Sequence, residues 1–189
     1  RKYSQTYTEA VQLNFKEHLL QFPIFTILGN AADELGLETY VIGGYVRDLI
    51  LKRPDKDIDV VCIGSGIALA TKVAEALGPD TYLNVFKNFG TAQIPYGDFD
   101  LEFVGARRES YRSETRKPLV EDGTLEDDQN RRDFTINAMG ISLNKATFGE
   151  LIDPFDGLGD IEGKLLKTPL EPGITLSDNQ LRMMRAIRF

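Results

Sequence analysis

The chain contains a single cysteine, Cys62, which limits the ways in which its fold can be stabilised. One cysteine cannot form an internal disulfide, and a lone histidine, His18, cannot complete a Cys/His zinc site with it. A chain of 189 residues is long enough to bury a sizeable apolar core. The fold must therefore rest on that core, and a reducing, cytoplasmic setting fits this cysteine usage.

The composition argues against two classes of partner. No apolar run approaches the ~20 residues that span a bilayer, and residues 1–5 do not resemble a signal peptide, so no membrane partner is expected. A net charge of −7 and a pI near 4.8 argue against coating nucleic acid by bulk electrostatics. Contacts with nucleic acid must then come from local basic groups, for which the candidates are Arg107, Arg108, Arg112, Arg116, Lys117, Arg131, Arg132, Arg182, Arg185 and Arg188.

The spacing of apolar residues predicts helices that alternate with strands. Helical spacing covers residues 8–20, 24–36, 45–52, 67–77 and 128–138, and a last helix begins near Ser177 or Asp178. Strand-like runs cover residues 39–42, 57–63, 93–94, 98–104, 139–143 and 148–152. Gly36 is placed to end the second helix, and the charged stretch 105–127 is expected to be a long mobile loop.

Two carboxylates stand at alternate positions of the strand-like run 57–63. Asp57 and Asp59 therefore leave the same face of the strand, while the apolar residues between and after them enter the core. Neighbouring anions repel each other unless a cation lies between them, and Mg²⁺ binds carboxylates together with water and phosphate oxygens. Asp100 or Glu102, which share one face of another strand, could supply a third carboxylate.

Other kinds of site were considered for residues 55–66. A solvated strand edge or turn remains an alternative for Asp57 and Asp59. A calcium-binding loop is excluded, because Val60 stands where glycine is required and Gly66 where glutamate is required. Gly64 and Gly66 lack the third glycine of a dinucleotide-binding turn, and the chain has no Gly-Lys-Ser/Thr phosphate loop.

A diglycine, Gly43-Gly44, separates a strand-like run from a helix that carries Arg47. Glycines leave backbone N–H groups open to a bound anion, and the helix N-terminus and the arginine add positive charge. A triphosphate would fit there. The alternative is a tight turn without a ligand.

Five blocks of the sequence together resemble the class II tRNA nucleotidyltransferases and bacterial poly(A) polymerases. They are VIGGYVRD at 41–48, DID at 57–59, RRDFTINA at 131–138, DPFDG at 153–157 and LRMMRAIRF at 181–189. The resemblance implies a polymerase-beta-like nucleotidyltransferase head of the α/β (α+β) class, with a mixed sheet flanked by helices. This head is expected over residues 1–160, and residues 161–189 are expected to begin a helical neck. An apolar stripe still runs at Phe189, so we expect the chain to be truncated.

The resemblance also implies roles for individual residues. Residues that match Asp57 and Asp59 hold the metal ions, and Glu102 is the candidate third acid. The triphosphate, ribose and base of the nucleotide are expected to meet a larger set: Gly43, Gly44, Arg47, Arg132, Asp133, Asn137, Asn179, Arg182, Arg185 and Arg188.

The last helix adds two observations of its own. Its three arginines recur at every third residue, so they share one side of the helix, where they would be costly without anions. A solvated basic face is the alternative. Asn179 stands where the family usually has a base-reading aspartate, and an amide both donates and accepts hydrogen bonds. The choice between CTP and ATP therefore stays open.

Taken together, the residues and the resemblance predict a template-independent RNA nucleotidyltransferase acting on the 3′ end of tRNA, with CCA addition favoured. A terminal RNA hydroxyl would attack the α-phosphate of CTP or ATP, with Mg²⁺ at Asp57 and Asp59 and pyrophosphate leaving. The stretch 105–127 is expected to close over the nucleotide. A poly(A) polymerase, a CC-adding or A-adding enzyme, and a binding module that has lost catalysis stay open. The sequence predicts no oligomeric state.

Overall fold

The computed structural model describes residues 13–110 and 119–170, which build a seven-stranded sheet. The strand order is β3-β4-β5-β2-β1-β8-β9. β2 and β5 pair in parallel, and the other neighbours pair antiparallel, so the expected mixed sheet is confirmed. The strands are β1 (Thr39–Ile42), β2 (Asp57–Cys62), β3 (Asn84–Phe86), β4 (Thr91–Tyr96), β5 (Phe99–Gly105), β8 (Gly140–Ser142) and β9 (Leu151–Ile152).

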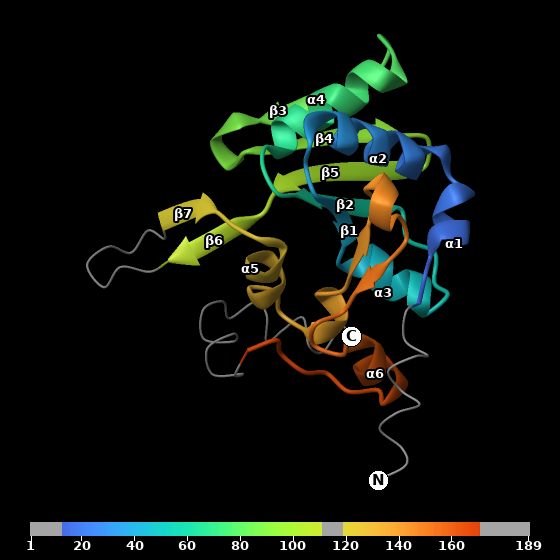
Figure 1. Cartoon of the computed structure of the whole chain (residues 1–189), viewed down its shortest axis with the longest axis vertical. Helices are drawn as coiled ribbons and strands as arrows, with labels where there is room; N and C mark the ends of the chain where they lie inside the picture. Colours follow the sequence, from blue (N-terminus) through green and yellow to red (C-terminus); the bar gives the residue numbers. More distant parts are fainter. Residues whose placement is uncertain (1–12, 111–118, 171–189) are drawn as a thin grey trace.

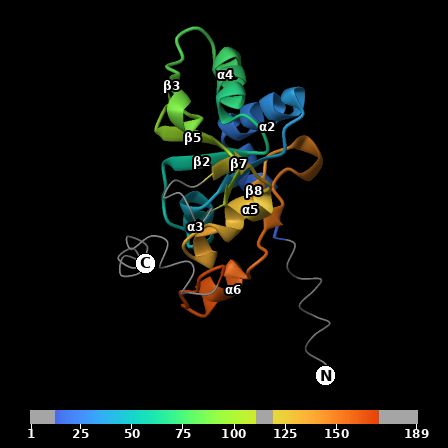
Figure 2. The same cartoon turned by 90° about the vertical axis from the view of Figure 1, so that its left-hand side faces the viewer.

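Helices lie on both sides of the sheet. The α-helices of the described residues are α1 (Lys16–Leu20), α2 (Pro23–Leu35), α3 (Gly44–Ile50), α4 (Gly66–Leu77), α5 (Leu125–Asn130) and α6 (Gly157–Glu162). α2 and α4 lie together on one side of the central strands (Figure 1), and the view turned by 90° places α5 on the other side (Figure 2). Among the described residues, none of the helices has the length and apolar character needed to cross a bilayer.

The core lies between the sheet and the α2/α4 layer. Ile58 and Val60 of β2 and Leu101 and Phe103 of β5 are at most 1% exposed and belong to one apolar cluster. Each such side chain contributes about 1.5–3 kcal/mol when it is fully buried. Because side chains alternate along a strand, the residues between them leave the opposite face of the sheet.

Helix ends follow local sequence signals. α2 begins with Pro23 in its first turn and is followed by Gly36 at φ 66, in the left-handed region, so the predicted glycine stop is confirmed. α4 is capped by Ser65, whose Oγ accepts a hydrogen bond from the Ala68 N–H at 3.1 Å. These two helices can therefore present whole apolar faces to the sheet.

The predicted helix at 128–138 is wrong in its bounds. α5 starts earlier, because Thr124 and Asp127 form a reciprocal capping box, and the helix ends at Asn130. Phe134 is extended, with φ −132 and ψ 152, and a short 3₁₀ turn follows at Thr135–Asn137.

The predicted loop at 105–127 is also wrong in part. β6 (Arg107–Ser110) and β7 (Leu119–Asp122) pair antiparallel, while residues 111–118 lie outside the described residues. The residues of β6 and β7 are rich in charge, so these two strands lack the apolar alternation from which a strand can be predicted. Backbone pairing between strands does not require that alternation. β3 was not predicted either, because three residues are too few to show a period.

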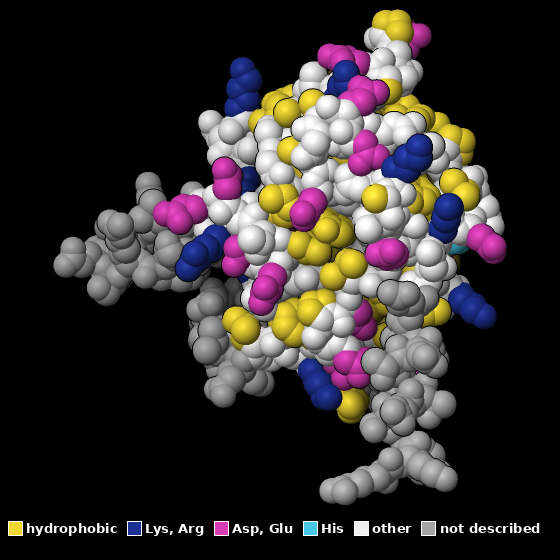
Figure 3. Space-filling model, in the orientation of Figure 1, with side chains coloured by type: hydrophobic (Ala, Val, Ile, Leu, Met, Phe, Trp, Pro, Cys, Tyr) yellow, Lys and Arg dark blue, Asp and Glu magenta, His cyan; other side chains and the backbone are white. Residues whose placement is uncertain are grey.

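Charged side chains are spread over the surface. Figure 3 shows acidic and basic groups interspersed on the face that it presents, without a continuous basic stripe. This distribution agrees with the net charge of −7 and gives that face no groove of positive potential for an RNA backbone.

Candidate functional site

Four carboxylates lie on the face of the sheet opposite α2 and α4. The parallel register of β2 and β5 places Asp57 opposite Asp100 and Asp59 opposite Glu102. These four acids border a groove of about 600 Å³ that continues over β4. The structure therefore brings the predicted pair of aspartates beside Glu102, the expected third acid.

Asp59 is more buried than Asp57. Ionisation of the Asp59 carboxyl therefore costs more free energy of solvation. Burial raises the pKa of the Asp59 carboxyl above its ordinary 3.8, and the negative charge of Glu102 raises it further. The Arg132 guanidinium acts in the opposite direction and lowers this pKa. An ionised Asp59 would therefore be stabilised by a cation in the groove.

The acids offer the hard oxygen ligands that Mg²⁺ prefers. Within the part of the chain that the structure describes, no three His, Cys, Asp or Glu side chains form a ready-made metal cage. Asp57 and Asp59 would then supply part of a coordination shell, which water and substrate oxygens complete in most Mg²⁺ sites. Their chemistry fits the ion, and metal binding at these two residues stays a prediction.

The diglycine lies where β1 ends and α3 begins, and it faces the acids. Gly43 has φ 83 and ψ −135, a conformation that side chains rarely permit. A Cβ built on Gly43 would lie 3.0 Å from Nη1 of Arg132 and 3.7 Å from Oδ2 of Asp59. Because Gly43 has no side chain, the space between the Arg132 guanidinium and the Asp59 carboxylate stays free for a ligand.

We expect Gly43→Ala to destabilise the fold by about 1–3 kcal/mol, because alanine is strained at this φ and ψ. Its methyl group would also press against Arg132. Urea unfolding measures the loss. Gly44→Ala is the matched control, because Gly44 has ordinary φ and its nearest contact would be 3.6 Å away. Equal stability of the two variants would contradict the argument.

A chain of polar contacts joins Arg47 to the predicted ribose and phosphate block. Arg47 donates to both carboxylate oxygens of Asp48, at 2.9 and 3.0 Å, and to Oδ1 of Asn137 at 2.7 Å. Asn137 in turn donates to Oδ1 of Asp133 at 3.1 Å, which also accepts the Phe134 N–H at 2.8 Å. The structure thus brings Arg47, Asn137 and Asp133 together. Asp48 completes the group, and sequence reasoning had given it no role.

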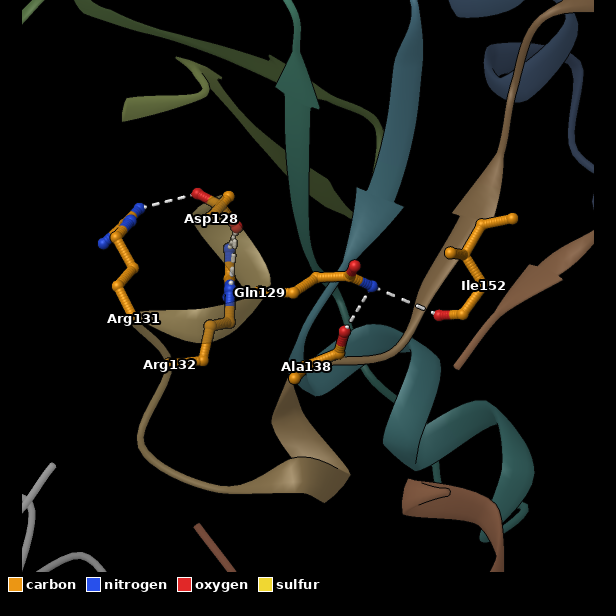
Figure 4. A network of polar contacts seen from close by, with 6 residues as sticks. All are labelled: Asp128, Gln129, Arg131, Arg132, Ala138 and Ile152. Atoms are coloured by element: carbon orange, nitrogen blue, oxygen red, sulfur yellow. Dashed lines mark hydrogen bonds and ion pairs between the residues drawn. The ribbon is translucent and has the colours of Figure 1, made fainter. Parts of the chain in front are cut away.

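A second network fixes Arg132 through a buried acid (Figure 4). Asp128 is 1% exposed and accepts two hydrogen bonds from Arg132, both at 3.0 Å, and one from Arg131 at 2.8 Å. Gln129 donates to the carbonyls of Ala138 and Ile152 at 2.9 and 3.3 Å and so anchors α5 to the sheet. Sequence reasoning missed Asp128, although its spacing of three and four residues from the arginines is a recognisable signal.

The remaining predicted site residues, Asn179, Arg182, Arg185 and Arg188, lie outside the described residues. Their roles stay predictions.

Comparison with known proteins identifies similar chains. The family described as "Poly A polymerase head domain" matches residues 39–167. An A-adding tRNA nucleotidyltransferase from Aquifex aeolicus (strain VF5) is 42% identical over 153 residues, which cover 81% of this chain and 18% of that protein.

Solved structures give the same result. A CCA-adding enzyme in its apo form II has a TM-score of 0.82 at 34% identity, over 93% of this chain and 42% of that chain. A tRNA nucleotidyltransferase complexed with a primer tRNA and an incoming ATP analog has a TM-score of 0.74 at 39% identity, over 86% of this chain and 44% of that chain. The chain thus spans less than half the length of these relatives.

Proposed function

Because the chain belongs to the poly(A) polymerase head-domain family, we propose that it is the catalytic head of a template-independent RNA nucleotidyltransferase that extends the 3′ end of tRNA. The observation that carries this proposal is the meeting of Asp59, Gly43 and Arg132 at one point beside Asp57. Acids that can hold a cation and a guanidinium that can hold phosphate are both needed for nucleotidyl transfer.

Each group has a role that follows from its position. Asp57 and Asp59 would hold Mg²⁺, which when bound polarises phosphate oxygens and favours ionisation of the attacking hydroxyl. Arg132, oriented by Asp128, would contact the triphosphate across Gly43. Arg47 and Asn137 would position the phosphates and the ribose of the nucleotide. The hydrogen bond between these two side chains would hold both of them in place.

The strand order also supports a direction for the proposed reaction. β1, which carries the diglycine, lies on one side of β2, and β5 lies on the other. In phosphoryl transfer the attacking and leaving oxygens are roughly in line. Pyrophosphate would therefore leave on the β1 side, toward Arg132 and Arg47, and the RNA hydroxyl would approach over β5.

The product is tested by incubating the full-length protein with tRNA that lacks its 3′ end and with each labelled nucleotide. Addition of C, C and A from CTP and ATP is the expected result. Addition of A alone is the second candidate, because the Aquifex relative is an A-adding tRNA nucleotidyltransferase. A long A tract would identify a poly(A) polymerase, and no addition at all would contradict the proposal.

We propose that Asn179 and Arg182 read the incoming base.

The proposal places the enzyme in the cytoplasm, a reducing compartment. Cys62 is a free, buried thiol, and burial raises its pKa to about 11, which keeps it protonated and unreactive there.

We expect Arg47→Ala to raise the KM for both ATP and CTP by roughly tenfold, because a charged hydrogen bond to phosphate contributes ~1.5 kcal/mol or more. The loss should be shared, since phosphate contacts carry no base information. Nucleotide titrations measure it. Arg53→Ala, an exposed arginine just beyond α3, is the matched control. A defect confined to one nucleotide would move Arg47 into base selection.

We expect this chain alone to bind tRNA weakly, with a Kd above about 1 μM near physiological salt, because affinity for RNA backbones needs several basic contacts in one groove. Its net charge is −7, and Figure 3 shows no continuous basic stripe on the face viewed. A gel shift with labelled tRNA measures the binding, and the full-length protein serves as the comparison. Sub-micromolar binding by the chain would contradict the expectation.

A further inference from the structure

The acidic groove continues beyond the acids across two more strands. Asp59 is opposite Glu102, Glu102 is opposite Gln93 of β4, and Gln93 is opposite Asn84 of β3. Strands lie about 4.8 Å apart, so Asn84 is roughly 10 Å from Glu102. Ala92, beside Gln93, is fully buried on the core side, so Gln93 faces the groove.

The chemistry of this extension differs from that of a phosphate site. Among the described residues that line the groove there is no lysine or arginine, and the extension consists of Tyr82, Asn84, Gln93 and Pro95. Tyr82 is 67% exposed, so the faces of its ring are open to a ligand. An exposed aromatic ring and a pair of amides are the groups that stack on a nucleobase and hydrogen-bond its edge.

The position of the extension decides which nucleotide it would hold. The cationic groups, Arg47 and Arg132, lie on the β1 side of the acids, and the extension lies on the β5 side. The negatively charged triphosphate is expected to bind beside these two arginines. An in-line reaction then brings the attacking hydroxyl from the β5 side, together with the base of the RNA nucleotide that carries it.

We propose that the groove over β5, β4 and β3 holds the terminal nucleotide of the RNA primer, with its base stacked on Tyr82 and its edge read by Asn84 and Gln93. This inference rests on the proposed function and adds a specificity site for the RNA end. The amides can both donate and accept, so they can distinguish one terminal base from another. The groove's volume of about 600 Å³, which includes the space over the four acids, leaves room for a nucleoside beside them.

The first test separates RNA from nucleotide binding in the full-length protein. Tyr82→Ala should raise the KM for the RNA primer roughly tenfold, as expected for one lost stacking contact, and should change the KM for ATP by less than about twofold. Tyr82→Phe, which keeps the ring, should restore most of the RNA affinity. Phe89→Ala is the matched control, because Phe89 is 66% exposed on the neighbouring turn and does not line the groove. Equal effects of Tyr82→Ala and Phe89→Ala, or an effect on the KM for ATP alone, would overturn the proposal.

The amides are tested by the choice of RNA end. Gln93→Ala should reduce the spread of kcat/KM among primers that end in A, C, G or U. An unchanged spread, with Asn84→Ala also without effect, would remove the base-reading role.

The second test does not depend on activity. RNA with a photoreactive base at its 3′ terminus is cross-linked to the full-length protein, and the modified peptide is identified. Cross-links in residues 82–95 support the proposal even if the protein adds no nucleotide, an outcome that would contradict the proposed function alone. Cross-links confined to other segments would overturn the groove assignment while leaving nucleotide addition intact.

Discussion

Asp59→Asn is expected to abolish nucleotide addition and to stabilise the metal-free protein near neutral pH. The two effects have one cause, which is a carboxylate kept where its charge is unfavourable until a cation binds. We expect kcat to fall by about a thousandfold or more, since metal stabilisation of the transition state contributes several kcal/mol. The expected gain in the free energy of unfolding is about 0.5–2 kcal/mol, the range common for single stabilising substitutions.

The direction of the stability effect follows from the raised pKa of Asp59. Burial raises this pKa above its ordinary 3.8, so the fold favours the protonated carboxyl. The corresponding stability is present below the ordinary value and is lost as the pH rises through the raised pKa. Above the raised pKa the wild-type protein carries the ionised, unfavourable form. The stability gain from asparagine should therefore be largest above that pKa and should shrink as the pH falls through it.

Urea unfolding in the presence of a chelator, at pH 7 and at pH 4, measures this effect. Mg²⁺ should then raise the Tm of the wild-type protein and leave that of Asp59→Asn almost unchanged, because a ligand that binds only the folded state stabilises it. Asp98→Asn, an exposed aspartate in the turn between β4 and β5, is the control for a change of net charge. Near-normal turnover of Asp59→Asn in Mg²⁺ would show that the metal assignment is wrong.

Those parts of the site that depend on neighbouring residues could be predicted from the sequence. The i, i+2 spacing of Asp57 and Asp59 sets their common face wherever the strand lies, and two glycines after a β-prone run predict a tight turn. Strand register could not be predicted, because it joins residues far apart in the chain. The sequence therefore left Asp100 and Glu102 as alternatives, and the structure places Asp100 opposite Asp57 and Glu102 opposite Asp59.

Asp128 shows a different limit. It stands in the acidic run at 126–128, which is typical of a solvated helix face, yet it is almost fully buried. Its burial depends on the docking of α5, which Gln129 anchors to two carbonyls remote in sequence. The structure pairs both Arg131 and Arg132 with this buried acid.

Asp128→Asn is expected to weaken both the fold and nucleotide binding. The substitution keeps the shape of the side chain and removes the charge that three guanidinium hydrogen bonds meet. Loss of charge at a buried, hydrogen-bonded acid should lower the free energy of unfolding by about 2–3 kcal/mol. Arg132 would no longer be held beside Gly43 and Asp59, so we expect the KM for ATP and CTP to rise roughly tenfold.

Unfolding by urea and nucleotide titration of the full-length protein measure the two effects separately. Glu126→Gln is the matched control, because it removes one negative charge from an exposed position on the same helix and should change neither quantity appreciably. A purely structural acid would lower stability and leave the KM for nucleotides unchanged at temperatures well below Tm. A rise in KM under those conditions, where the variant is fully folded, can come only from the altered position of the arginines, and it would identify Asp128 as the residue that orients Arg132 toward the triphosphate.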